Sequence, residues 1–224
     1  MGRSIAFRSR DGTPAVDVES RRTWPKSLRA ALEANDCRRA DEILAGEKIL
    51  GFHCTKLLSH ERAEILDGGL QPLSPELAEK RVQSARRLNH LSQTVADRLL
   101  RVNAAGDAYR RGMIWFVFRR SLLRRKSGVW SLLCCWGGEA IYGLHTGDPD
   151  VGPVLKTIGE PSLVVAAVPG DRIETGRLSR FFLKADGAAS GDYVKGPISA
   201  AWIIDIVDRS DPRFEALTKY STWT

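Results

Sequence analysis

The chain has 224 residues, of which 43% are hydrophobic and 27% are charged, and its formal net charge is +7. These proportions are those of a folded globular protein and exclude a largely disordered chain. No apolar run approaches the length of a bilayer span, and the first residues lack the basic-then-apolar layout of a signal peptide. We therefore expect a cytoplasmic protein with no membrane segment.

Residues 1–47 are expected to form an N-terminal extension with helices, ahead of a single main domain at 48–224. Trp24-Pro25-Lys26 opens a helical stretch, and Asn35-Asp36 divides it. The inner face of this stretch is apolar, with Leu28, Ala31, Leu32, Ile43 and Leu44 at helical spacing.

The segment Ile49–Leu57 predicts a buried strand that ends on His53 and Thr55 just before a helix starts at Ser59. Polar side chains at the mouth of a buried strand are common ligand-binding groups. His53 could equally be a histidine at the edge of the core, hydrogen-bonded to backbone. Other features of the sequence are needed to choose between these two interpretations of His53.

Further along, Gly68-Gly69 closes the helix that starts near Ser59, and Ser74-Pro75 starts a helix or helix pair that runs to about Val102. Leu88, Leu91, Val95, Leu99 and Val102 predict its buried stripe. Strands are expected at 113–118, 162–168 and 201–207, with a helix from Ser127 to Ile141 between the first two. Helices followed by strands without βαβ alternation predict an α+β fold: N-terminal helices plus a mixed or antiparallel two-layer sheet core.

The positive charge is concentrated between Asp107 and Glu139, where the sequence has no acidic residue. Such a block could contact nucleic acid or simply face solvent. Its cations are Arg110, Arg111, Arg119, Arg120, Arg124, Arg125 and Lys126.

Several common catalytic motifs are absent from the sequence. There is no glycine-rich phosphate loop, no H-E-x-x-H and no G-x-S-x-G. The four histidines are not spaced as metal ligands, so no metal site is predicted. P-loop nucleotide enzymes and the common hydrolase classes are therefore disfavoured.

Four short motifs occur in an informative order. Phe52-His53-Cys54-Thr55 precedes a helix closed by the segment 67–73, the aromatic strand 115–118 follows, and Gly191-Asp192-Tyr193-Val194 leads into a late strand. In this order they resemble the ADP-ribosyltransferase fold, over roughly residues 48–208. The resemblance implies an enzyme that uses NAD to transfer ADP-ribose to a protein or nucleic acid, as toxins and phage-defence enzymes of this fold do.

The resemblance also implies roles for individual residues. His53 and Thr55 would hold a ribose, and Arg119 would meet the pyrophosphate. Phe116, Phe118 and Ser127 would lie against the nicotinamide. Cleaving the bond to nicotinamide builds positive charge on the sugar, which a carboxylate can stabilise. Asp192 stands where the family has a glutamate, and Glu139 is its rival for this catalytic role.

Two alternatives remain open. The chain could be a non-enzymatic module that binds nucleic acid or another partner through its basic block. It could also be an RNA 2′-phosphotransferase, which shares the fold but needs a set of arginines that the sequence does not identify. Neither the acceptor nor the oligomeric state follows from the sequence.

Overall fold

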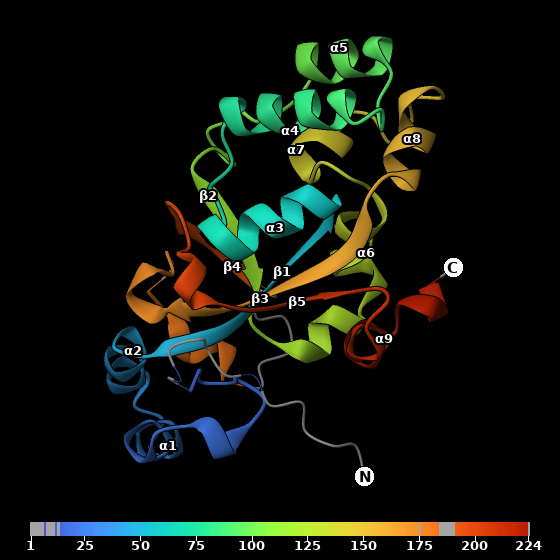
Figure 1. The fold of residues 1–224 in the computed structure, drawn as a ribbon. Coiled ribbons are helices and arrows are strands. Elements are labelled where there is room, and N and C mark those ends of the chain that lie inside the picture. The colour runs from blue at the N-terminus through green and yellow to red at the C-terminus, as the bar shows by residue number, and fades with distance from the viewer. Residues whose placement is uncertain (1–6, 8–11, 13, 175, 184–190, 224) are drawn as a thin grey trace.

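The computed structural model describes residues 7, 12, 14–174, 176–183 and 191–223, and within them the fold is α+β (Figure 1). Its centre is a five-stranded antiparallel sheet of order β4-β2-β1-β3-β5. The strands are β1 Lys48–Leu57, β2 Met113–Val117, β3 Glu160–Pro169, β4 Gly191–Lys195 and β5 Ile203–Asp208. The predicted α+β class is confirmed, and of the two expected sheet types the antiparallel one is present.

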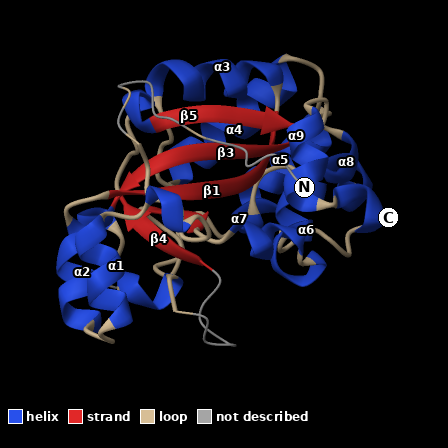
Figure 2. Cartoon of the chain, turned by 90° about the horizontal axis from the view of Figure 1, so that it is seen from below, coloured by secondary structure: helices blue, strands red, loops and turns tan. Residues whose placement is uncertain are grey.

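The helices gather around the two ends and both faces of this sheet (Figures 1 and 2). They are α1 Lys26–Glu33, α2 Cys37–Ala45, α3 Ser59–Gly68, α4 Pro75–Arg87, α5 Gln93–Arg101, α6 Lys126–Cys134, α7 Glu139–Tyr142, α8 Val151–Thr157 and α9 Pro212–Thr218. α1 and α2 lie at one end of the sheet, and α7 and α8 lie at the other. None of the helices in the described residues is both long and apolar enough to cross a membrane.

Successive side chains of the central strands point to opposite faces of the sheet, and each face has its own apolar cluster. Ile49 and Val164 pack with α1 and α2 on one face, while Phe52 and Val165 pack with α6 and α9 on the other. Helices therefore cover both faces of a single sheet, and the two layers expected from the sequence are replaced by three. A separate cluster around Trp136 joins α4, α5, α7 and α8.

The N-terminal segment shares the core of the sheet. Val16 forms a parallel bridge with Ile49, and its backbone N–H donates to the Lys48 carbonyl at 2.8 Å. Trp24 and Leu44 belong to the same apolar cluster as the sheet residues. Residues on both sides of position 47 thus stabilise one core.

The predicted helix starts are largely present. Asn35 has a φ of 54° and Asp36 caps α2, so the break between α1 and α2 is confirmed. The Ser74 hydroxyl accepts from the Leu77 N–H at 3.1 Å and caps α4. In α3 the cap differs from the expected one. Ser59 was expected to cap this helix, but Leu58 holds the cap position and its N–H donates to the Glu61 side chain.

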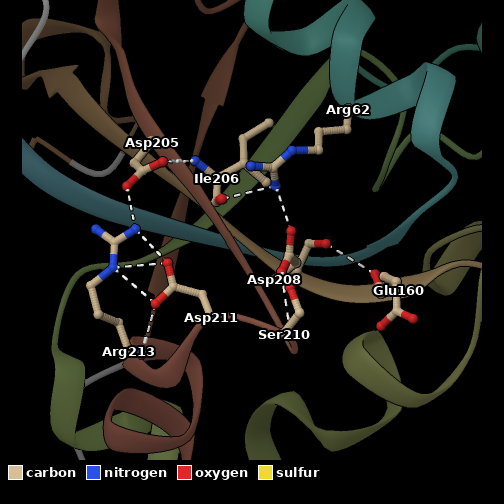
Figure 3. A network of polar contacts seen from close by, with 9 residues as sticks. Arg62, Glu160, Asp205, Ile206, Asp208, Ser210, Asp211 and Arg213 are labelled. Carbon is tan, nitrogen blue, oxygen red and sulfur yellow. Dashed lines mark hydrogen bonds and ion pairs between the residues drawn. The ribbon is translucent and has the colours of Figure 1, made fainter.

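Ion pairs fasten the edge strand β5 to helices on both faces (Figure 3). Arg62 of α3 donates to the Ile206 carbonyl and to the Asp208 carboxylate, each at 2.9 Å. Arg213 of α9 pairs with Asp205 of β5 at 2.8 Å. These contacts hold β5 at its edge of the sheet.

Three expectations about elements are wrong. The helix expected from Ser127 to Ile141 is broken: α6 ends at Cys134, and Gly137 and Gly138 adopt φ values of 99° and 71° before α7 begins. Leu88 and Val102 are 51% and 43% exposed, so they do not belong to the buried stripe. β4, at 191–195, was not among the strands expected from the sequence.

Candidate functional site

The site begins where β1 and β2 separate. β1 pairs with β3 along its whole length, from Lys48 opposite Pro169 to Leu57 opposite Glu160. With β2 the register of the described strands contains one pair, Phe52 opposite Val117. Beyond this pair the strands diverge, and a gap opens beside the second half of β1.

A cavity of about 460 Å³ occupies this gap. Consecutive residues of β1 line it, although successive side chains of a strand point to opposite faces. Residues of both β1 and β2 line it, so the cavity lies where these two strands diverge. Its lining includes Phe52, His53, Cys54 and Thr55 of β1, Ile114, Trp115, Phe116 and Val117 of β2, Gln71, Leu77, Arg81, Arg110 and Glu139.

His53 bridges the gap. Its Nδ1 lies 2.9 Å from the Trp115 carbonyl oxygen, and because a carbonyl can only accept, Nδ1 carries the proton. Burial lowers the pKa of His53, and the nearby charge of Arg81 lowers it further, against the opposing effect of the Trp115 hydrogen bond. The imidazole is thus neutral near pH 7, with Nε2 as a hydrogen-bond acceptor.

Arg81 of α4 is fixed from several sides at this cavity. Its Nε donates to Glu61 at 2.6 Å, and its guanidinium lies 5.0 Å from the centre of the Trp136 ring. Burial would raise the pKa of Glu61, but the charge and hydrogen bond of Arg81, with the Leu58 N–H and the Trp136 indole, lower it overall. Glu61 therefore stays ionised and holds Arg81 in place.

A second cavity of about 440 Å³ adjoins the first. The turn at Gly68 and Gly69 lines it together with Lys80. The residues that line both cavities are His53, Thr55, Gln71, Leu77 and Arg81. The two cavities therefore form one cleft with His53 and Arg81 at its middle.

Glu139 lies at the other side of the first cavity. The Gly137-Gly138 turn places it at the start of α7, and Arg110 pairs with its carboxylate at 2.8 Å. The Glu139 side chain is 60% exposed, so its carboxylate is accessible to a ligand. The Nε of Arg110 is buried and has no hydrogen-bond partner among the described residues.

Asp192 lies close by in the sheet but outside the cavity. It is opposite Phe116 in the pairing of β2 with β4, and the ring centre of Phe116 lies 6.0 Å from that of His53. Phe116 stands between Asp192 and His53. The Asp192 carboxylate is 3% exposed and accepts from Arg180 at 2.8 Å. Its geometry is that of a buried structural ion pair.

Of the other residues predicted for cofactor binding, some line the cavity at His53 and others lie elsewhere. Thr55 and Phe116 line the cavity with His53. Phe118 is 1% exposed and packs on Phe181 with ring centres 4.9 Å apart, away from the cavity. Arg119 lines a different cavity. Ser127 lies in the first turn of α6, and its side chain is outside the described part of the structure.

The basic block is also divided. Arg110 and Arg111 precede β2, whereas Arg119, Arg120, Arg124, Arg125 and Lys126 follow it. Arg120 pairs with Asp17 at 2.7 Å, and Arg124 donates to the Ala216 carbonyl at 3.1 Å. Strand β2 therefore divides the block into two groups of cations. Arg120 and Arg124 each bind a neighbouring segment of the chain.

Arg81, Gln71 and the ion-pairing role of Arg110 were not anticipated from the sequence. Arg81 lies among several arginines of one helical stretch, and nothing local distinguishes it. The signal for Arg81 in the sequence was Glu61, in the first turn of the preceding helix. A buried carboxylate there needs a cation as partner.

Comparison of the chain with models of known protein families, with curated proteins and with solved structures found no match.

Proposed function

We propose that the chain is a cytoplasmic NAD-dependent ADP-ribosyltransferase of the ADP-ribosyltransferase fold, with its site in the gap between β1 and β2. The observation that carries this proposal is the meeting of His53, Thr55 and Glu139 at one cavity. These residues come from segments far apart in the chain. Glu139, rather than Asp192, is the carboxylate that this geometry offers.

The residues of the cleft fit a dinucleotide. Two cations, Arg81 and Arg110, line the same cavity and suit the two negative charges of a pyrophosphate. The unpartnered Nε of Arg110 lacks the acceptor that a phosphate oxygen would supply. Trp115 and Phe116 supply aromatic surface for a planar ring. Cavities of about 460 and 440 Å³ lie in the range of ligand sites.

NAD would supply an ADP-ribosyl group whose glycosidic bond to nicotinamide breaks with the electron pair leaving on the ring nitrogen. Because nicotinamide leaves as a neutral molecule, no residue has to protonate it. Glu139 faces the positive charge that develops on the sugar and accepts the proton that the attacking acceptor loses. The neutral Nε2 of His53 accepts a hydrogen bond from a ribose hydroxyl and so fixes the sugar.

Arg110 holds Glu139 in its ligand-free position. A phosphate entering the cavity competes with Glu139 for the same guanidinium. We expect the ion pair to loosen as the dinucleotide binds, which turns the carboxylate toward the sugar.

The test measures nicotinamide release and transfer of label from NAD to pooled protein, RNA and DNA acceptors. Glu139→Gln should lower the rate by about 100-fold or more, as loss of a group that stabilises transition-state charge does. Its stability should change by less than about 0.5 kcal/mol, because the side chain is mostly exposed.

Asp192→Asn is the matched control. It removes a carboxylate of the same charge that is outside the cavity, so NAD cleavage should persist while the protein is destabilised by about 1–3 kcal/mol. The opposite pattern, with activity lost in Asp192→Asn and retained in Glu139→Gln, would assign catalysis to Asp192. Absence of nicotinamide release and of label transfer with every acceptor would exclude the enzyme and favour the binding module.

A further inference from the structure

Arg119 has an environment that the proposed site does not explain. It follows β2 at the end opposite Arg110, and its Nε is buried without a hydrogen-bond partner among the described residues. Burying a charged donor without an acceptor costs free energy, and native proteins resolve such cases with water or a ligand.

Arg119 is exceptional even among the arginines of this kind. Arg110 and Arg180 also have a buried Nε without a hydrogen-bond partner in the described structure, but each pairs with a carboxylate through another nitrogen. For Arg119 no ion pair and no ring contact is present within the described part of the chain. Among the described residues its guanidinium therefore has no carboxylate partner in an ion pair.

The guanidinium lines a cavity of about 610 Å³, separate from the cleft at His53. Trp24 and Phe182 form an aromatic wall, with ring centres 5.1 Å apart. A second cation, Arg21, lies 5.5 Å from the centre of the Trp24 ring and lines the same cavity. The cavity is therefore built from the N-terminal segment, from Arg119 after β2 and from Phe181 and Phe182.

The charge in this cavity favours an anion. Glu19 also lines it, and one of its carboxylate oxygens accepts from the Ser121 N–H at 3.0 Å. Arg21 and Arg119 outnumber this single negative charge. A phosphate carries about −1.5 to −2 charges near neutral pH and so matches two guanidinium groups better than a carboxylate does.

We propose that this cavity is a second ligand site, which binds a phosphate group through Arg119 and Arg21. The phosphate belongs either to a small molecule or to a nucleic-acid backbone that reaches the cavity. The site lies outside the cleft at His53, so phosphate binding there does not depend on whether the protein cleaves NAD.

The experiment is calorimetric titration at low ionic strength with inorganic phosphate, AMP and an oligothymidylate. Arg119→Gln should weaken binding by about tenfold or more, and Arg119→Lys should recover part of the affinity. Loss of phosphate and AMP binding identifies a small-molecule site, whereas loss confined to the oligonucleotide identifies a backbone site.

Two variants serve as controls. Arg125→Gln removes the same charge from an exposed position nearby and should leave affinity within about twofold. Arg81→Gln alters the first cleft, and Arg119-dependent binding should persist in that variant. The proposal is overturned if no probe binds saturably or if Arg125→Gln weakens binding as much as Arg119→Gln.

Thermal unfolding without ligand supplies an independent readout. Arg119→Gln should unfold at the same temperature as the wild type or higher, because it removes a charge that has no ion-pair partner in the described part of the chain. Arg180→Gln, which breaks the pair with Asp192, should unfold at a lower temperature. Equal destabilisation by both would show that Arg119 already has a structural role, and would overturn the proposal.

Discussion

At the scale of single residues, His53 combines the two roles that the sequence left open. It is hydrogen-bonded to backbone, as a histidine at the edge of the core would be, and it also lines the central cavity. The bond from Nδ1 replaces the backbone pairing that β1 and β2 lose as they diverge. A structural bond at one nitrogen thus leaves the other nitrogen for a ligand.

The lowered pKa of His53 makes stability depend on pH. Above the ordinary value of 6.5 the imidazole is neutral in both states, and its contribution to stability is complete. As the pH falls below 6.5, the unfolded chain takes up a proton that the folded protein resists, so stability declines until the folded pKa is passed. One proton gives a slope of at most about 1.4 kcal/mol per pH unit.

His53→Asn tests this prediction. The asparagine amide can still donate to the Trp115 carbonyl, but it cannot titrate and has no counterpart of Nε2. Denaturant unfolding between pH 7.5 and pH 5 should show a shallower loss of stability in the variant. Parallel curves for the two proteins would mean that His53 titrates normally in the folded state.

The residues of the site were predictable in part. His53, Thr55 and Glu139 were predicted for the site, and the structure places all three at one cavity. Arg81 was not found, because a helix surface has many arginines and its distinction comes from the buried Glu61, twenty positions away. Asp192 was also predicted for the site, and the sequence motif did not reveal its ion pair with Arg180.

At the scale of elements, the turn between α3 and α4 closes the second cavity. Gly69 has a φ of 80°, and a Cβ there would lie 1.9 Å from the Ile198 carbonyl oxygen. Leu70 bridges to Ile198 directly after it. The close approach of these two backbones requires glycine.

Gly69→Ala should therefore destabilise the protein by at least about 2 kcal/mol, through the strained φ and the clash. Gly68→Ala is the matched control, because a Cβ at Gly68 meets nothing within 4 Å, and it should be neutral or stabilising by up to about 1 kcal/mol. Chemical denaturation measures both. Similar stabilities for the two variants would show that the turn tolerates a side chain at either position.

Elements with strong periodicity or caps were predicted well, and those shaped by distant contacts were not. Asp36 and Ser74 fix their helix starts locally, which makes them visible in the sequence. β4 is not visible in this way, because buried Asp192 interrupts its apolar face and is stabilised by Arg180 and by the Tyr193 N–H. Gly137-Gly138 was expected to fit inside a helix, but α6 ends at Cys134, and the positive φ values of the two glycines place Glu139 at the start of α7.

At the scale of the whole molecule, the N-terminal helices are part of the core rather than an appendage. Trp24, Leu28 and Leu44 pack in the cluster that also contains sheet residues. Deleting residues 1–47 should therefore abolish cooperative unfolding, because it exposes one face of the sheet. Circular dichroism melts of residues 48–224 check this, and a cooperative transition in that fragment would show that the main domain folds alone.

The whole-molecule feature on which the functional argument depends is the gap between β1 and β2, with the cleft at its mouth. Its most direct test is a crystal structure of the Glu139→Gln protein with NAD, in which slowed cleavage preserves the dinucleotide. We predict NAD in the cleft, with its pyrophosphate at Arg81 and Arg110 and a ribose hydroxyl bonded to His53 Nε2. A cleft without NAD at saturating concentration, or NAD bound at another place on the protein, would contradict the account.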